Sequence, residues 1–227
     1  EDLTPAEAEQ SRLFRNARTI LTALEESGGT KATQAGNLNR KFVQQMMEQL
    51  DLGVESRDDF IRERGKTVNE QDLVSLHVPR VLLELARLVR KYKGAFVVTK
   101  RGSRLRADDQ AGALYALLFR THFRRYNLGY LTYVVEEPLL QYGAAFSLLI
   151  AGRLMGDWRL LEDVAPRLAL PPIAANLRAR LVVPAHLDYV LYSYILRPLV
   201  ELGVLEERWV GKFPESRHEM RKTALFD

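Results

Sequence analysis

The residues best suited to chemistry in this 227-residue chain are basic side chains gathered between positions 80 and 106. This stretch holds nine arginines and lysines and one acid, Glu84, so its net charge is +8, whereas the whole chain carries only +4. Arginine and lysine neutralise phosphates, and a phosphate backbone responds to local potential rather than to total charge. We therefore predict a nucleic-acid-binding surface made of Arg80, Arg87, Arg90, Lys91, Lys93, Lys100, Arg101 and Arg104.

A solvated helix face is the alternative explanation for some of these cations. Arg80, Glu84, Arg87 and Lys91 recur at helical spacing, and on a helix Glu84 can pair with Arg80, with Arg87 or with both. A glutamate in the centre of a binding face would repel phosphates, although it can accept a hydrogen bond from cytosine N4. The sequence leaves both explanations open.

Patterns typical of catalysis or of metal binding are missing from the sequence. The histidines do not have the HExxH spacing of zinc enzymes, and they are His77, His122, His186 and His218. Adjacent acids such as Asp108-Asp109 point about 100° apart on a helix and do not converge. No phosphate-binding glycine loop or nucleophile elbow is present. We expect no catalytic residue, no metal, no cofactor and no small-molecule ligand, and therefore a protein that is not an enzyme.

The composition is that of an ordinary globular protein, with 47% hydrophobic and 27% charged residues. The absence of cysteine excludes disulfides and Cys-based zinc sites, and it fits a reducing cytoplasm. The longest uncharged run, residues 138–152, is shorter than the roughly 20 residues of a membrane span, so we predict a buried helix there and no membrane contact. No basic segment followed by an apolar stretch opens the sequence given, so we expect no secretory signal. The first residue is Glu1 rather than Met, so we expect either a trimmed chain or a piece of a longer protein.

Helical signals dominate the first 92 residues. Thr4 and Glu7 have the spacing of a capping box for a helix over 4–26. A short extended piece follows over 30–33, and then a second helix that Asn37 could cap. The charged residues 55–72 read as an exposed linker, and the apolar spacing over 77–92 predicts a third helix.

An apolar hairpin then explains the run between the two clusters of positive charge. Gly94 can adopt positive φ at a turn, and Phe96 and Val98 alternate toward the inside of a strand. Thr99 can leave that strand and cap the next helix. The order helix, strand, helix, helix, hairpin predicts a mainly α fold with a winged-helix-like unit and short β-hairpins.

The rest of the chain suggests a helical connector and a second, weaker unit of the same kind. We predict a winged-helix-like domain over 1–110 with a charged insert near 51–72, a connector over 111–165, and the second unit over 166–227. The segments "LLELARLVRKYKGAFVVTKRG" and "YILRPLVELGVLEERWVGK" both run from an apolar helix through a turn into a β-like stretch. Residues 186–227 have a net charge of −1, so we predict no phosphate-binding surface there.

The segment "LARLVRKYKGAFVVTKRGSRL" resembles bacterial winged-helix regulators, whose hairpin often ends in a Thr-x-x-Gly step, here Thr99 to Gly102. The stretch from "AGNLNRKFV" to this segment is also similar to a part of uncharacterised bacterial proteins, among them relatives of plasmid open-reading-frame proteins and insertion-element passengers. The resemblance covers about the first 125 residues. It implies a fold and no established activity.

Two functions follow from these features as hypotheses. The first is a cytoplasmic regulatory protein that binds nucleic acid, and DNA in particular, through its basic helix and hairpin. The second is a protein-interaction or dimerisation scaffold without nucleic-acid binding, in which the apolar helices 138–156 and 186–202 supply the interface to a second copy or to another protein.

Overall fold

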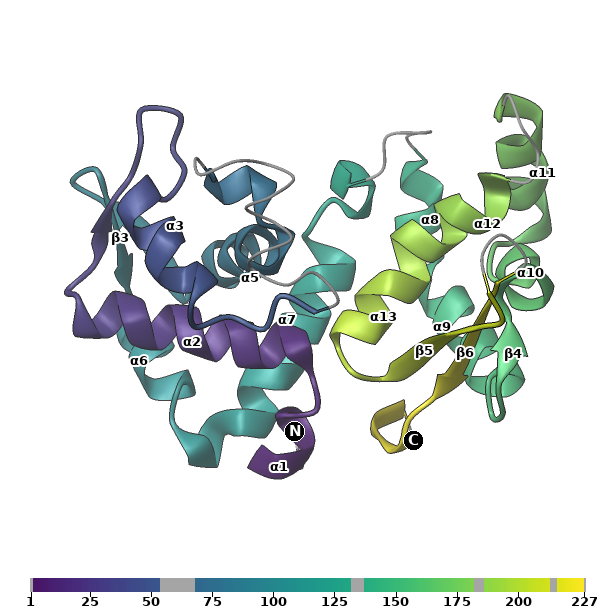
Figure 1. Cartoon of the computed structure of the whole chain (residues 1–227), viewed down its shortest axis with the longest axis horizontal. Helices are drawn as coiled ribbons and strands as arrows, with labels where there is room; N and C mark the ends of the chain where they lie inside the picture. Colours follow the sequence, from purple (N-terminus) through teal and green to yellow (C-terminus); the bar gives the residue numbers. More distant parts are fainter. Residues whose placement is uncertain (1, 54–67, 132–136, 182–185, 213–215, 227) are drawn as a thin grey trace. The chain divides into compact units, whose positions relative to one another are not determined.

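The computed structural model divides the chain into two compact units, residues 1–121 and 122–227 (Figure 1). It describes residues 2–53, 68–131, 137–181, 186–212 and 216–226. In its described part each unit is mainly helical and carries a three-stranded antiparallel sheet. The division at 121 falls inside the segment predicted as a connector. Most of the predicted charged insert lies outside the described residues.

Capping residues set where the first helices begin. Helix α1 (Pro5–Ala8) starts at the capping box of Thr4 and Glu7, which confirms that prediction. The single helix predicted over 4–26 is interrupted, because Ser11 accepts a hydrogen bond from the Phe14 N–H and thereby begins a second helix, α2 (Arg12–Glu26). Helix α3 (Arg40–Met47) is capped by Asn39, so the prediction of Asn37 as its cap is wrong.

The helix predicted over 77–92 ends much earlier than the periodicity indicated. After the 3-10 turn η1 (Glu70–Asp72), helix α5 (Val74–Leu85) stops because Arg87 adopts a left-handed backbone with φ 61°. The Leu88 N–H then donates to the Leu83 carbonyl at 2.8 Å, a closure typical of helix C-termini. Residues 89–92 are therefore available to form a strand.

The predicted hairpin is present, with strand β2 (Val89–Tyr92) paired to strand β3 (Ala95–Val98). Lys93 and Gly94 turn the chain with φ 48° and 75°, which confirms the positive φ predicted for Gly94. Phe96 is fully buried as predicted, whereas Val98 is only half-buried. Strand β1 (Thr30–Lys31) pairs with the other side of β3, so the sheet order is β1-β3-β2.

The step from Thr99 to Gly102 joins this sheet to helix α6 (Lys100–Leu105). Thr99 caps α6, as predicted, because its hydroxyl oxygen accepts a hydrogen bond from the Gly102 N–H at 3.1 Å. A Cβ at Gly102 would lie 2.3 Å from the Leu88 carbonyl oxygen, so this close approach of helix to strand requires glycine. The 3-10 turn η2 (Asp108–Gln110) and helix α7 (Ala111–Arg124) follow.

Helix α2 forms the floor of the first unit. It packs against α5, β3 and α6, and Figure 1 shows it crossing the unit beneath α3 and α5. Its buried face includes Phe14, Ile20, Leu21 and Leu24. Burial of these side chains together with Phe96 makes the hairpin part of the core rather than a loose extension.

The second unit has the same kind of sheet, with the order β4-β6-β5. The sequence of its elements is η3 (Leu128–Leu131), α8 (Pro138–Tyr142), α9 (Ala144–Leu154), β4 (Arg159–Leu160), α10 (Leu161–Val164), η4 (Ala165–Arg167), α11 (Pro171–Arg180), α12 (His186–Leu191), the π-helical η5 (Tyr192–Leu196), α13 (Arg197–Glu201), β5 (Leu205–Val210), β6 (Arg217–Lys222) and η6 (Ala224–Phe226).

The prediction of one buried helix over 138–152 is wrong in two respects. The run is broken at Gly143 into α8 and α9. Helix α9 buries mainly small side chains, Ala144, Ser147 and Ala151, and it exposes the larger Leu149.

The buried position of Phe96 gives a first prediction. Phe96→Ala should lower the free energy of unfolding by about 3–5 kcal/mol, the usual cost of removing a buried aromatic ring. Lys100→Ala, an exposed site four residues away, should change it by no more than about 0.5 kcal/mol. Thermal or denaturant unfolding followed by circular dichroism measures both variants. Equal, small effects would show that residues 91–106 are a loose linker.

Candidate nucleic-acid interface

Arg80 does not belong to the surface that the sequence predicted. Its side chain is only 6% exposed, with Nη2 2.6 Å from Oε1 of Glu70 and Nη1 2.8 Å from Oε2 of Glu84. The Arg80–Glu84 pairing considered from the sequence is therefore present. Its main partner, Glu70, is fully buried, although the charged composition around it had indicated an exposed linker.

Glu70 is the centre of a buried polar network. Its Oε2 accepts a hydrogen bond from the Leu38 N–H at 2.5 Å, and its Oε1 lies 2.8 Å from Nδ1 of His77. The Arg80 guanidinium also lies 5.3 Å from the centre of the Phe96 ring. Glutamate and histidine are residue types used in acid–base catalysis, but these side chains and that of Arg80 are closed to solvent. Their arrangement is suited to holding elements together.

Electrostatics keep Glu70 ionised in this network. Burial acts to raise the pKa of its carboxyl group. The hydrogen bond from His77, the positive charge of Arg80 and the Leu38 N–H outweigh burial, so the pKa of Glu70 lies below its ordinary value. The folded state therefore favours the charged carboxylate.

The other seven predicted cations are exposed and come from three consecutive features of the fold. They lie in the turn after α5, on the hairpin and on α6, and they are Arg87, Arg90, Lys91, Lys93, Lys100, Arg101 and Arg104. None of the seven forms an ion pair within the described part of the chain. By contrast, Arg15, Arg18 and Arg106 of the same unit are each paired with a carboxylate. Most exposed cations of this unit that have no ion pair among the described residues thus lie within residues 87–104.

The tip of the hairpin adds an aromatic ring that the sequence analysis missed. Tyr92 is 50% exposed, and its ring centre lies 5.0 Å from the Arg90 guanidinium and 5.5 Å from the Lys93 ammonium. Exposed aromatic rings among cations are used to stack on nucleic-acid bases. The helix predicted over 77–92 placed Tyr92 at a helix end rather than beside a turn, so the exposure of its ring on the hairpin was not predicted.

Lys31 is a second residue that only the fold brings to this surface. It is exposed on β1 and pairs in the sheet with Ala95, next to the hairpin turn. It stands far from the basic segment in the sequence, so no local signal could have placed it there. On helix α5, in contrast, no residue is more than partly exposed. The hairpin and α6, rather than the predicted helix over 77–92, therefore present the cations.

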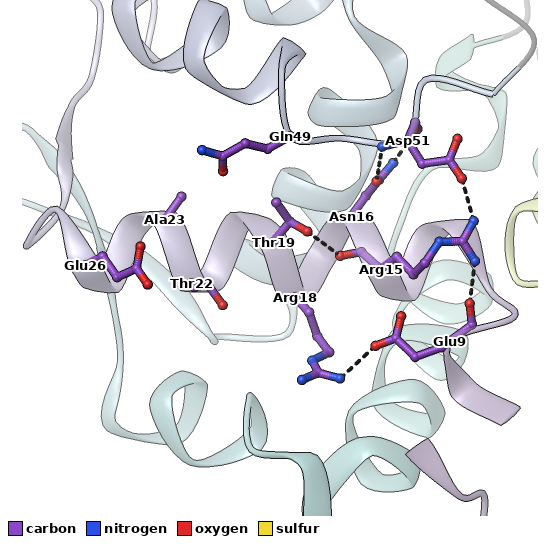
Figure 2. Close-up of a pocket in the computed structure, with 10 residues that line it drawn as sticks. All are labelled: Glu9, Arg15, Asn16, Arg18, Thr19, Thr22, Ala23, Glu26, Gln49 and Asp51. Carbon is purple, nitrogen blue, oxygen red and sulfur yellow. Dashed lines mark hydrogen bonds and ion pairs between the residues drawn. The ribbon is translucent and has the colours of Figure 1, made fainter. Parts of the chain in front are cut away.

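A hollow of about 410 Å³ lies along α2 in this unit (Figure 2). Its arginines are already neutralised: Arg15 lies 2.5 Å from Asp51, and Arg18 lies 2.7 Å from Glu9. Burial acts to raise the pKa of Asp51, but hydrogen bonds from Arg15 and Gly53 hold it below its ordinary value. Asn16 ties the Asp51 backbone to α2 through two hydrogen bonds of 3.0 Å. These paired groups brace the structure and leave no cation for an anionic ligand.

Among the residues that the structure describes, no three His, Asp or Glu side chains are placed to share a metal ion. Over the same residues no helix combines the length and the apolar character needed to cross a bilayer.

Comparison with known proteins links the first unit to a bacterial domain. Residues 9–112 match the family model described as the Y4jL N-terminal domain, and this span contains all seven exposed cations. A curated relative, the uncharacterized protein y4jL of Sinorhizobium fredii, is 35% identical over 101 residues. The match covers 44% of this chain and 46% of the relative, so it spans about half the length of that protein. No solved structure matches the chain.

The buried carboxylate of Glu70 gives a second prediction. Glu70→Gln should lower the free energy of unfolding at pH 7 by about 3–5 kcal/mol, because it leaves the Arg80 charge buried without its main partner. Since the pKa of Glu70 is depressed in the folded state, the stability that it contributes is present above its unfolded pKa of about 4.3 and is lost as the pH falls through the folded value. The difference between wild type and variant should therefore shrink in acid.

Glu84→Gln is the matched control for this measurement. The Glu84 side chain is partly exposed and also pairs with Arg80, so its removal should cost about 1 kcal/mol or less. Denaturant unfolding at pH 7 and at acidic pH compares the two variants. Equal losses for Glu70→Gln and Glu84→Gln at pH 7 would contradict the central position of Glu70.

Proposed function

We propose that the first unit is a winged-helix domain that binds nucleic acid, and DNA in particular, as part of a regulatory protein of the cytoplasm. Its element order supports this proposal: helix α2, strand β1, helices α3 and α5, and the hairpin β2–β3 follow one another as in the winged-helix variant of the helix-turn-helix. The sheet pairs β1 with β3 and so attaches the hairpin to the body of the unit.

The observation that carries the proposal is the group of seven exposed cations over residues 87–104 that form no ion pair with any residue the structure describes. A cation that is already paired with a carboxylate gains little from a phosphate, whereas an unpaired cation releases counterions from the nucleic acid when it binds. The hairpin is held by a buried Phe96, so several of these charges are presented in a fixed arrangement. A polyanion fits such a surface better than a small ligand does.

Phosphate contacts are expected to dominate over base reading. Helix α5 would be the groove-reading helix of this fold, but its residues are buried or only partly exposed, and its partly exposed Glu84 is paired with Arg80. Contacts to phosphates, in turn, fix orientation without reading sequence. Tyr92 is the exposed ring that could stack on an unpaired base. We therefore propose binding with weak sequence preference and a steep dependence on salt.

Charge reversal on α6 tests this function. Lys100→Glu with Arg101→Glu should weaken binding to any duplex, and it should reduce the slope of log K against log salt by about 2, since each phosphate that a cation neutralises adds about 0.9 to that slope. Arg153→Glu with Lys212→Glu changes the net charge equally at exposed sites of the second unit and should leave binding unchanged. Fluorescence polarisation at low salt measures both. A wild-type protein that binds neither duplex nor single strands would refute the proposal.

Self-association through the second unit is a second candidate function, and the surface of α8 and α9 favours it. Leu139, Tyr142 and Leu149 are exposed there, Tyr142 to 83%, while smaller side chains are buried beneath them. No charged residue occurs between Glu137 and Arg153. A second copy could therefore meet this face without like-charge repulsion, as a two-fold symmetric interface requires. We propose a homodimer or a protein-docking scaffold on this basis.

Light scattering tests this second candidate. Wild type should be a dimer at micromolar concentrations, and Tyr142→Glu with Leu149→Glu should be monomeric, because two carboxylates would be buried in the contact. Leu170→Glu places a charge at another exposed apolar site of the same unit and should leave the dimer intact. A wild-type protein that stays monomeric throughout this range would contradict the dimer.

A further inference from the structure

The two units share one pattern of hydrogen bonds where helix, hairpin and following helical turn meet. In the first unit the Leu88 N–H donates to the Leu83 carbonyl, and the Thr99 N–H and hydroxyl donate to the carbonyls of Leu88 and Arg87, at 2.8, 2.9 and 3.0 Å. The second unit repeats these bonds. They join Val204 to Leu199, and Thr223 to Val204 and Gly203, at 3.0, 3.0 and 2.7 Å.

The strand registers agree as well. Phe96 lies between Lys91 on β2 and Thr30 on β1. Met220 lies in the same way between Glu207 on β5 and Arg159 on β4. Phe96 and Met220 are both fully buried. The units are therefore two copies of one structural motif, in which residues 83–92 correspond to 199–208 and residues 96–101 to 220–225.

This correspondence shows which positions the motif requires for folding and which residues are particular to the first unit. The buried and hydrogen-bonded positions are matched in kind, whereas five exposed cations are replaced by acidic or uncharged residues. The pairs are Arg87 with Gly203, Arg90 with Glu206, Lys91 with Glu207, Lys100 with Ala224 and Arg101 with Leu225. The motif therefore folds without these cations.

At Arg87 the first motif has a residue that is expected to lower stability relative to the glycine of the second motif. Its φ is 61°, and Gly203 has the same left-handed conformation at φ 74°. Glycine adopts this region freely, while a residue with a Cβ is disfavoured there. The Arg87 side chain is exposed and has no ion pair within the described residues. Its guanidinium therefore gains nothing visible from the folded chain that would offset the strained backbone.

We infer that Arg87 is a phosphate-contacting residue that is kept at a left-handed position for binding and against stability, and that phosphate binding is confined to the first of the two motifs. This inference rests on the proposed nucleic-acid-binding function and names one contact of that surface. Both motifs adopt this left-handed backbone, so the fold requires the conformation but not a residue with a Cβ there, and strain of this kind is characteristic of functional positions. The second motif, with glycine at the same place, is the internal reference.

Arg87→Gly, the residue of the second motif, should change stability and binding in opposite directions. The melting temperature should rise by about 1–4 °C as the strain is relieved. Affinity for a 20-base-pair duplex at low salt should fall roughly 3–10-fold, and the salt slope should decrease by about 0.9. Arg87→Lys keeps the charge and should restore most of the affinity without the gain in melting temperature.

Gly203→Arg is the reciprocal control. It should lower the melting temperature, because it creates the same strain in the second motif, and it should leave duplex affinity unchanged. Thermal denaturation and fluorescence polarisation on the full chain measure all variants.

The outcomes separate this inference from the function on which it rests. If the wild-type protein does not bind duplex, both the inference about Arg87 and the proposed function are refuted. If wild type binds and Lys100→Glu with Arg101→Glu binds weakly, but Arg87→Gly binds like wild type, the inference is overturned and the function stands. A melting temperature of Arg87→Gly at or below that of wild type would overturn the opposition between binding and stability.

Discussion

The first unit depends on the burial of one carboxylate, that of Glu70. A buried ionised group is tolerated only where charges and hydrogen bonds compensate it, and here Arg80, His77 and the Leu38 N–H do so. These partners come from α5 and from the loop before α3, so compensating one charge brings those segments together. The Arg80 guanidinium then lies against the Phe96 ring, which extends the same network to the hairpin.

This network divides the cations of the basic segment into two groups with different consequences. Arg80 is paired inside the unit, whereas the seven cations from Arg87 to Arg104 are exposed and have no carboxylate partner in the described part of the chain. A buried charge that is paired stabilises the segments around it, but its partner neutralises its field, so it does not attract a ligand. An exposed and unpaired charge has the reverse properties. The buried pair and the buried Phe96 thus support the platform on which the exposed cations stand.

The repeated motif shows that the framework and the surface are specified by different residues. Thr99 and Thr223 make the same hydrogen bonds, and Phe96 and Met220 occupy the same buried place in the sheet. The charges on the two hairpins nevertheless differ, with Arg90 and Lys91 where the second unit has Glu206 and Glu207. Surface charge can change freely in this framework because backbone hydrogen bonds and apolar burial hold it together. A shared fold therefore does not imply a shared partner for the two units.

The sequence by itself determined the features that depend on residues a few positions apart. The capping box of Thr4, the turn at Gly94, the inward Phe96 and the cap at Thr99 are of this kind, because a cap or a turn is formed by its immediate neighbours. Seven of the eight predicted cations are also exposed.

Only the tertiary structure decided the rest of the fold and of the basic surface. Residues 89–92 suit a helix by their own pattern and become a strand through pairing with 95–98. Lys31 joins the basic surface through its pairing with Ala95. Arg80 is absent from that surface because Glu70, ten residues earlier, is buried beside it. Long-range pairing and burial balance groups that are distant in the chain, and no local pattern records that balance.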